Sequence, residues 1–433
     1  MTPARLENGA PPREDLVPYR ERVEELRSVL VSHGSLGLLL VDTSPLAQIE
    51  HQYGSSAFAK VMGMARDLVI ELKGHEVRHE DVICLNDHGG DAFLVFFSPK
   101  RCEGPLKIAD LKAAAERVES HLNRKLLRLT SPYLETPRRV TVGFALAFYT
   151  PLVMPERLVS RLVEEGWACV HVLRDQRNLQ NRCDLQEILL ADQPSTVFQP
   201  IVELHPRRRR VLGYEALSRG PANSAYHMPE PLFAMAKEVH LVFELDRKCR
   251  RRALAAAVSL PKGAKLFVNV LPSAMYDPEF QGQALVGLVE GHGLSPDRVV
   301  LEITEKEAIE NYEVFSEALA ELTQLGFSIA VDDVGTGYSG LEKIARLNPR
   351  YLKFDRELIR SIDSSYIRRE MTRALKAFAD GIGSTIIAEG IERDGELQAL
   401  LELGIEYGQG YLLGKPESAF LPPAHSVAVA AAG

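Results

Sequence analysis

The chain has 433 residues, 45% of them hydrophobic, and a formal net charge of −8. This length exceeds one ordinary hydrophobic core, so we expect a globular protein of two domains. The acidic balance argues against a protein that binds nucleic acid non-specifically, because such a protein carries a basic surface.

The sequence also bears on the compartment. No apolar run approaches the roughly 20 residues of a membrane-spanning helix, and the first residues lack the apolar core of a signal peptide. The five cysteines are scattered and lack the paired spacing of a metal site, which fits a reducing cytoplasm. We therefore expect a cytoplasmic protein that neither enters a membrane nor binds nucleic acid.

The first half of the chain predicts alternating helices and strands. Residues 1–14 are polar and rich in proline and glycine, which is typical of disorder, and a lead helix follows from Val17 to His33. Strands are then expected at 36–41, 81–85, 92–97 and 140–148, and helices at 55–73, 106–125 and 155–165. This alternation predicts an α/β sandwich over residues 34–180.

A glycine-rich turn between two of these strands, GGDAF from Gly89 to Phe93, resembles the GGDEF signature of diguanylate cyclases. The segment 42–54 aligns without gaps with that family's metal- and guanine-binding segment. Ala92 stands where the family has an acid, and Ser44 replaces a second metal-binding aspartate. The guanine-contacting positions carry Glu50 and His51. The resemblance therefore implies a degenerate domain without cyclase activity, since a methyl group cannot hold Mg²⁺.

The sequence leaves open what this GGDEF-like domain does instead. It could bind GTP as an effector, form a homodimer or dock a signalling protein, and we favour the last two because the guanine contacts are altered. Arg78 and Asp81 match the RxxD spacing of the family's product-inhibition site, but they lie two residues further from the signature than usual.

The run HEVRH, His75 to His79, spells the HExxH pattern of zinc proteases. That pattern binds zinc only where both histidines share one face of a helix. The run follows Gly74, where the preceding helix is expected to end, so we predict a polar loop and no zinc site.

The second half predicts a (β/α)8 barrel, preceded by a polar connection at 178–194 that contains a short helix at 185–191. Eight apolar strands are expected at 197–202, 211–217, 265–270, 299–303, 328–331, 351–354, 385–388 and 408–412, with helices such as 228–257, 308–325 and 366–382 between them. A parallel crossover needs about a dozen residues, and the link between the first two strands is shorter. These two strands should therefore form an antiparallel hairpin with Arg207–Arg210 at its tip. We expect the barrel to span 181–420 and a flexible tail to follow at 421–433.

Polar residues stand where the predicted barrel strands end. They are Glu215, Asn269, Glu302, Asp332, Asp333, Lys353, Glu389 and Gln409. The carboxyl ends of barrel strands meet at one rim, so these side chains should converge on one pocket. Such an oxygen-rich set suits Mg²⁺ or Mn²⁺ rather than zinc. Two adjacent acids repel each other unless a cation lies beside them, although Asp-Asp before Val-Gly is by itself also an ordinary turn.

From about Leu185 to Pro416 the chain resembles the EAL family of cyclic di-GMP phosphodiesterases. The motifs are Gln199-Pro200-Ile201, Glu215-Ala216-Leu217 with Arg219, Asn269 in FVNV, Glu302-Ile303-Thr304-Glu305, DDVGTGYSGL at 332–341, Lys353 in LKFD, Ala388-Glu389-Gly390 and Gln409-Gly410-Tyr411. Val334 and Gly340 depart from the Phe and Ser that are usual in the family. Both lie in one loop, so the departure bears on turnover rate more than on the chemistry.

The resemblance implies a role for each motif residue. One metal ion would be held by Glu215, Asn269, Glu302 and Asp332, and a second by Asp332, Asp333 and waters fixed by Glu389 and Gln409. Lys353 would orient and help deprotonate the attacking water, and Glu305 would anchor the loop 332–339. The dinucleotide would contact Gln199, Leu217, Arg219, Asp355 and Gln409, and the catalytic set would be Glu215, Asp332, Asp333, Lys353 and Glu389.

The expected reaction is hydrolysis of one ester of cyclic di-GMP to linear pGpG, with two Mg²⁺ or Mn²⁺ ions about 4 Å apart. The main alternative is a non-catalytic cyclic di-GMP receptor or signalling scaffold. A third reading is a glycosidase, because barrels with paired acids often cleave sugars. A strict requirement for Mg²⁺ or Mn²⁺ would exclude the glycosidase.

Overall fold

The computed structural model describes residues 16–86, 91–99, 106–134, 138–205, 210–335 and 340–421. Five predicted features therefore lie outside the described residues: the polar N-terminal segment 1–14, Gly89 and Gly90 of GGDAF, Arg207–Arg209 of the hairpin tip, residues 336–339 of the DDVGTGYSGL loop, and the tail after Leu421. The chain divides into two compact units, residues 1–181 and 182–433. Among the described helices, none combines the length and apolar composition that crossing a membrane requires.

The N-terminal unit is built on one four-stranded antiparallel sheet in the order β2-β3-β1-β4. The strands are β1 (Ser35–Asp42), β2 (Val82–Leu85), β3 (Ala92–Phe97) and β4 (Thr141–Phe148). All eight residues of β1 are buried, because this strand lies between β3 and β4. Its last residue, Asp42, pairs with Ala92 of β3.

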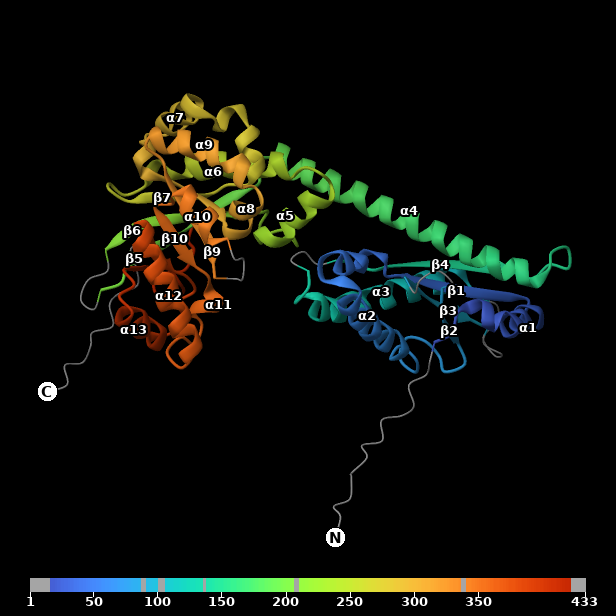
Figure 1. The fold of residues 1–433 in the computed structure, drawn as a ribbon. Coiled ribbons are helices and arrows are strands. Elements are labelled where there is room, and N and C mark those ends of the chain that lie inside the picture. The colour runs from blue at the N-terminus through green and yellow to red at the C-terminus, as the bar shows by residue number, and fades with distance from the viewer. Residues whose placement is uncertain are drawn as a thin grey trace, which may run out of the picture. The chain divides into compact units, whose positions relative to one another are not determined.

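Helices cover both faces of this sheet, as can be followed in Figure 1. They are η1 (Tyr19–Arg22), α1 (Val23–His33), η2 (Ser44–Ala47), α2 (Gln48–Ile70), α3 (Ile108–Thr130) and α4 (Pro155–Leu190). Side chains alternate between the faces of a strand, so Leu39 and Val41 pack with α2 and α3, whereas Leu38 and Leu40 pack with α1 and α4. The α2 helix begins at Gln48, before the predicted start at residue 55, and Gly54 interrupts it with a left-handed φ of 80°.

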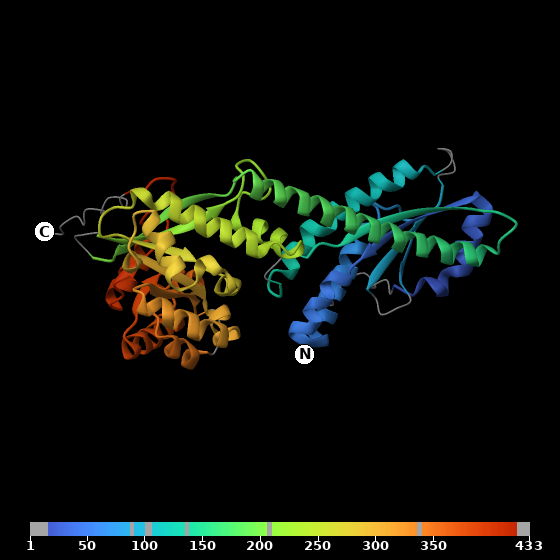
Figure 2. The same cartoon turned by 90° about the horizontal axis from the view of Figure 1, so that it is seen from above.

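The α4 helix corrects the sequence prediction, which gave a helix at 155–165 and a polar connection at 178–194. Figure 2 shows α4 as one uninterrupted helix. The segment is rich in Arg, Gln, Glu and Leu, which are good helix formers, and no proline interrupts it before Pro194. The early part of α4 buries Val159, Leu162 and Val170 in the N-terminal unit, and Leu185 and Ile188 near its end pack with helices of the second unit.

The second unit is a closed eight-stranded barrel in the order β10-β11-β12-β5-β6-β7-β8-β9, which confirms the predicted barrel. Its strands are β5 (Ser195–Glu203), β6 (Val211–Arg219), β7 (Lys265–Asn269), β8 (Val299–Thr304), β9 (Ser328–Val334), β10 (Tyr351–Phe354), β11 (Thr385–Ala388) and β12 (Tyr407–Gly408). The first two strands, β5 and β6, are antiparallel, as the short connection predicted. The other pairings are parallel except that of β12 with the reversed β5.

The helices around the barrel differ from the prediction at two places, and the last barrel strand is shorter than predicted. They are α5 (Pro229–Glu238), α6 (Val242–Ala256), α7 (Gly282–Gly291), α8 (Glu305–Glu310), α9 (Tyr312–Gln324), α10 (Leu341–Leu347), α11 (Arg356–Ile359), α12 (Tyr366–Ile382) and α13 (Asp394–Glu402), with short 3-10 turns η3 (Ala257–Ser259), η4 (Pro272–Tyr276), η5 (Pro278–Phe280) and η6 (Pro296–Arg298). His240 has a φ of 57°, which divides the predicted helix 228–257, and the non-helical Asn311 divides 308–325. The β12 strand stops at Gly408 because the amides of Leu413 and Gly414 turn back to the carbonyl of Gly410.

The continuity of α4 can be tested by proteolysis. Trypsin cleaves after arginines in extended segments and cleaves slowly where the arginine lies in an intact helix. We expect Arg177 and Arg182 to resist trypsin in the native chain. Leu179→Pro should break the helix, at a cost of about 3 kcal/mol, and open this region to cleavage into two fragments. Leu179→Ala is the control and should behave as the unmodified chain. Equal cleavage rates in all three proteins would show that residues 177–182 are a loop.

Candidate active site

One polar layer lies directly above an apolar layer inside the barrel. The apolar layer includes Ile201, Phe267, Val300, Ala330, Tyr351 and Ile387, with Tyr407 packed against it. Two positions further toward the carboxyl rim stand Asn269, Glu302, Asp332, Lys353, Glu389 and Gln409, and on the reversed β5 the equivalent position is Gln199. A strand repeats its side-chain direction every two residues, so both layers face inward. Glu215 on β6 pairs with Gln199.

The Lys353 side chain lies in the middle of this polar layer and is fully buried. Its Nζ lies 2.7 Å from Glu389 Oε1, 2.9 Å from Glu302 Oε1, 3.2 Å from Asp332 Oδ2 and 3.4 Å from Glu215 Oε2. Burial alone disfavours an ammonium ion, but the four surrounding carboxylates together hold the pKa of Lys353 well above its usual value. Lys353 is therefore a cation in this arrangement.

The carboxyl groups around Lys353 do not share one protonation state. Burial and neighbouring acids raise the pKa of Glu302, Asp332 and Glu389, in spite of the ammonium beside them. Burial likewise opposes the charge of Glu215, yet Lys353 and hydrogen bonds from two amides hold the pKa of Glu215 below its usual value. Glu215 is thus the carboxyl group of this set that ionises most readily, and further positive charge at the site would favour ionisation of the other three.

Amide side chains fix the orientation of Glu215. Asn269 Nδ2 donates to Glu215 Oε1 at 3.2 Å, and Gln409 Nε2 donates to Glu215 Oε2 at 2.6 Å. Gln409 Nε2 also donates to Gln199 Oε1 at 2.9 Å, and Gln199 Nε2 donates to the carbonyl of Gly414 at 3.0 Å. These bonds hold the carboxylate of Glu215 facing Lys353.

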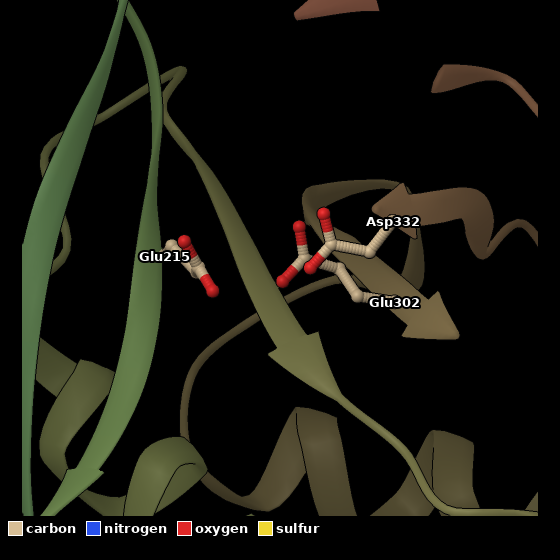
Figure 3. Close-up of side chains that lie close together, drawn as sticks. All are labelled: Glu215, Glu302 and Asp332. Atoms are coloured by element: carbon tan, nitrogen blue, oxygen red, sulfur yellow. The ribbon is translucent and has the colours of Figure 1, made fainter. Parts of the chain in front are cut away.

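The acids form two overlapping groups with the chemistry of a divalent-cation site. Glu215, Glu302 and Asp332 place one oxygen each within 4.8 Å of one another, and Asp332, Asp333 and Glu389 do the same. Figure 3 shows the carboxyl groups of the first group gathered from three strands. Both carboxylate oxygens of Glu302 and Oε1 of Gln409 are buried without a hydrogen-bond donor, although Glu302 contacts Lys353. Buried acceptors of this kind fit hard cations, so the residues present suit Mg²⁺ or Mn²⁺.

Asp333, a member of the second group, lies near the end of β9 in an unusual backbone conformation. Its φ of 58° is left-handed, and its backbone amide donates to Asp332 Oδ1 at 2.9 Å. Burial, followed by the charges of Asp332 and Asp355, raises the pKa of Asp333 to about 7. Two residues on, the amide of Gly335 donates to Glu305 Oε2 at 3.0 Å, so Glu305 holds the start of the loop 332–339. Residues 336–339 of that loop lie outside the described chain.

A model of the EAL domain matches residues 182–416, which is more than half of the chain. The chain belongs to the EAL-domain family. It is 28% identical over 269 residues to "Probable cyclic di-GMP phosphodiesterase PdeA" of Escherichia coli (strain K12), an alignment that covers 60% of this chain and 37% of that protein. It is 23% identical over 430 residues to "Cyclic di-GMP phosphodiesterase PdeA" of Borreliella burgdorferi (strain ATCC 35210 / DSM 4680 / CIP 102532 / B31), covering 92% of this chain and 60% of the relative. The chain thus spans less than two thirds of the length of either relative.

Among solved structures, the EAL barrel is similar to "PaMucR Phosphodiesterase, c-di-GMP complex". The two are 26% identical with a TM-score of 0.50, and the match covers 55% of this chain and 97% of that one. The 55% of this chain that the solved structure covers is about the share that the EAL domain, residues 182–416, makes up. The N-terminal unit lies outside the residues that the family model matches.

Three of the predicted substrate-binding residues of the EAL domain, Leu217, Arg219 and Asp355, have separate surroundings and do not form one cluster as the predicted metal ligands do. Leu217 borders a cavity of about 270 Å³ beside Glu215 and Asn269. Arg219 Nη1 donates to the carbonyl of Ser218 at 2.8 Å. Asp355 caps α11, accepting from the amide of Glu357 at 2.7 Å, so its carboxylate has a structural role whatever else it contacts.

The same cavity is lined by residues that the sequence analysis missed. Phe233 on α5 and Asp246, Cys249 and Arg250 on α6 face it. Asp246 and Arg250 are both buried and form an ion pair at 2.8 Å, and burial raises the pKa of Asp246 to about 6. The sequence signal for this site was the spacing of Asp246 and Arg250, an acid and an arginine four residues apart. Such pairs are common on exposed helix faces, so the spacing did not indicate a cavity.

Two N-terminal motifs take structural positions. Arg78 Nη2 pairs with Asp81 Oδ1 at 3.1 Å, the Arg78 amide donates to Asp81 Oδ2, and the guanidinium also donates to the carbonyl of Ser98. The two residues of the RxxD spacing therefore bind each other and the end of β3. The HExxH run from His75 to His79 follows the end of α2 in turns, as predicted, and neither histidine belongs to a metal-sized cluster within the described residues.

The raised pKa of Asp333 predicts how stability depends on pH in the absence of metal. The folded state keeps this proton up to about pH 7, whereas the unfolded chain releases it near 3.8, so the stabilisation is complete below that lower value and is lost as pH rises through 7. In EDTA we expect the free energy of unfolding to fall between about pH 4 and 7, by up to about 1.4 kcal/mol per pH unit for this proton, and to level off above pH 7. Asp333→Asn should flatten the slope in urea titrations followed by circular dichroism.

The control for this titration is Asp67→Asn, which removes an exposed carboxylate on α2 and should leave the wild-type slope unchanged. An unchanged slope in Asp333→Asn would show that Asp333 is ionised throughout this range.

Proposed function

We propose that the EAL domain hydrolyses cyclic di-GMP to linear pGpG with two divalent ions, Mg²⁺ or Mn²⁺. The observation that carries this proposal is the pair of acidic groups that share Asp332 around the buried Lys353. It is supported by the cyclic di-GMP phosphodiesterase names of the two relatives and by the cyclic di-GMP complex of the similar structure.

The proposed ligands follow the two acidic groups. One ion would be held by Glu215, Asn269, Glu302 and Asp332, and the other by Asp332 and Asp333, with Glu389 and Gln409 acting through water. When bound, the ions supply Lewis acidity to the phosphate and activate water as a nucleophile. The chemistry is an in-line displacement in which the water oxygen bonds to phosphorus and the 3′ oxygen leaves with a proton.

Lys353 would have two successive tasks in this reaction. As an ammonium ion it donates hydrogen bonds and can orient the attacking water. It can take part in removing a proton from that water only when its pKa is lowered, and cations bound to Glu302 and Asp332 would lower it by offsetting their charge. Substrate would contact Gln199, Leu217, Arg219, Asp355 and Gln409, and the guanidinium of Arg219 is suited to phosphate.

The N-terminal unit is proposed to be a degenerate GGDEF domain with a regulatory or dimerisation role in a homodimer. The position opposite Asp42 on the sheet is the buried methyl group of Ala92, which supports the absence of a metal-dependent cyclase there.

The phosphodiesterase proposal is tested by incubating the purified chain with cyclic di-GMP and Mn²⁺ or Mg²⁺ and separating the nucleotides by chromatography. We expect pGpG to form and EDTA to abolish its formation. Glu215→Gln and Asp332→Asn should each lower the rate by about a hundredfold or more, since each removes a charge that stabilises the transition state. Glu357→Gln, an exposed change on α11, is the matched control and should keep the full rate.

Two results would contradict the proposal. Full activity in Glu215→Gln would place the chemistry elsewhere, and binding of cyclic di-GMP without turnover would make the barrel a receptor or scaffold instead.

The absence of cyclase activity must be tested in a variant whose phosphodiesterase site is inactivated, so that any cyclic di-GMP formed is not hydrolysed. The Asp332→Asn chain given GTP and Mg²⁺ should yield no cyclic di-GMP by mass spectrometry, because Ala92 and Ser44 offer no carboxylate for the ion. Detection of cyclic di-GMP would show that the N-terminal unit is an active cyclase.

A further inference from the structure

We propose that the guanidinium of Arg174 is a built-in cation that takes the charge position of a divalent metal at the end of β1 in the N-terminal unit. This goes beyond the phosphodiesterase proposal and does not depend on it. Three observations carry it: the burial of Asp42, the reach of Arg174 to both positions 42 and 44, and, among the described residues, the absence of any group of three acids around Asp42 that could share an ion.

Asp42 presents a buried charge that needs a partner. It is the last residue of the central strand and is fully buried. Its Oδ1 accepts a hydrogen bond from the backbone amide of Ser44 at 3.0 Å. Its Oδ2 is buried without a hydrogen-bond donor and forms an ion pair with Nη2 of Arg174. A carboxylate removed from water in this way is strongly destabilising unless a cation lies beside it.

Arg174 reaches this place from the middle of α4. The nitrogen that pairs with Asp42 also donates to Oγ of Ser44 at 3.2 Å. By their resemblance to diguanylate cyclases, positions 42 and 44 are the two metal-binding positions of that segment, so one guanidinium nitrogen contacts both. The side chain of Arg174 is only 29% exposed, so it is held against the strand end rather than free in solvent.

The remaining ligands do not fit a divalent ion. Ala92, paired with Asp42 across the ladder, contributes a buried methyl group. Ser44 contributes a neutral hydroxyl where a second carboxylate would stand, and Arg174 already occupies the cation position beside Oδ2 of Asp42. Within the described chain, Asp42 belongs to no group of acids close enough to share an ion. One carboxylate and one guanidinium balance each other, so the metal-binding geometry has become an internal ion pair.

The surroundings show why a cation is still required. Burial, with the charges of Asp42 and Glu50, raises the pKa of the neighbouring Asp91. The strand end is therefore an acidic environment, although positions 44 and 92 carry no carboxylate. A second arginine one turn further along α4, Arg177, pairs with Glu119 of α3 at 2.5 Å and donates to Thr141 of β4. Arg174 and Arg177 together attach α4 to its own sheet.

The test uses the full chain carrying Asp332→Asn, so that metal bound in the barrel does not contribute. Trp167 is the single tryptophan and packs on the N-terminal core, so its fluorescence reports the unfolding of this unit. In EDTA, Arg174→Ala should lower the midpoint of thermal unfolding by about 6 °C or more, because it leaves Asp42 buried and unpaired. Asp42→Asn combined with Arg174→Met should recover most of that loss. Arg161→Ala, an exposed change on α4, is the control and should have no effect.

The readout that separates a metal substitute from an ordinary salt bridge is restoration of a missing carboxylate. Millimolar Mg²⁺ or Mn²⁺ should raise the midpoint of the double variant Ser44→Asp, Arg174→Ala by several degrees, and it should leave Arg174→Ala alone and the chain with Arg174 unchanged. The proposal is overturned if Mg²⁺ stabilises Arg174→Ala alone or the chain with Arg174, if it does not stabilise the double variant, or if Arg174→Ala is as stable as its parent. None of these outcomes bears on hydrolysis of cyclic di-GMP, which is assayed separately.

Discussion

The EAL barrel depends on one buried ammonium ion among carboxylates that would otherwise repel one another. Lys353 contacts four acids within 3.4 Å, and a fifth, Asp333, follows Asp332 directly. A single positive charge cannot balance five negative ones in a region of low dielectric constant, so the remaining acids either hold protons or bind further cations. The raised pKa values of Glu302, Asp332, Asp333 and Glu389 and the fit to divalent ions are two consequences of the same charge imbalance.

The barrel interior holds the charged side chains around Lys353 in place, because an apolar layer packs directly beneath them. A layer of apolar residues, one from nearly every strand, fills the interior beneath the polar layer. The reversed β5 places Gln199 opposite Glu215, and the chain of amides from Gly414 through Gln199 and Gln409 to Glu215 keeps that carboxylate ionised and oriented. The antiparallel first pair of strands thus contributes directly to the electrostatics of the site.

The N-terminal unit also buries a carboxylate at a strand end, but there an arginine balances its charge. A carboxylate at a strand end, Asp42, is buried as deeply as the acids of the barrel, but among the described residues it belongs to no group of three acids that could share an ion. A single arginine suffices to balance a single charge, whereas the five acids of the barrel exceed what Lys353 can balance. This difference in charge explains why we propose metal-dependent chemistry in one unit and none in the other.

The sequence alone determined the barrel, because apolar runs at regular spacing mark its strands and the short link before Val211 excludes a parallel crossover. It also indicated the acids of the site, since strand ends in a barrel share one rim wherever they fall in the chain. It did not give the unbroken α4 helix, the division of helices at His240 and Asn311, or the cavity residues of α6, since these depend on packing rather than on local periodicity. The ion pair of Arg174 with Asp42, together with the hydrogen bond that Arg174 donates to Ser44, is the clearest case. The arginine stands 130 residues after Ser44, and only the tertiary structure brings this residue of α4 to the end of β1.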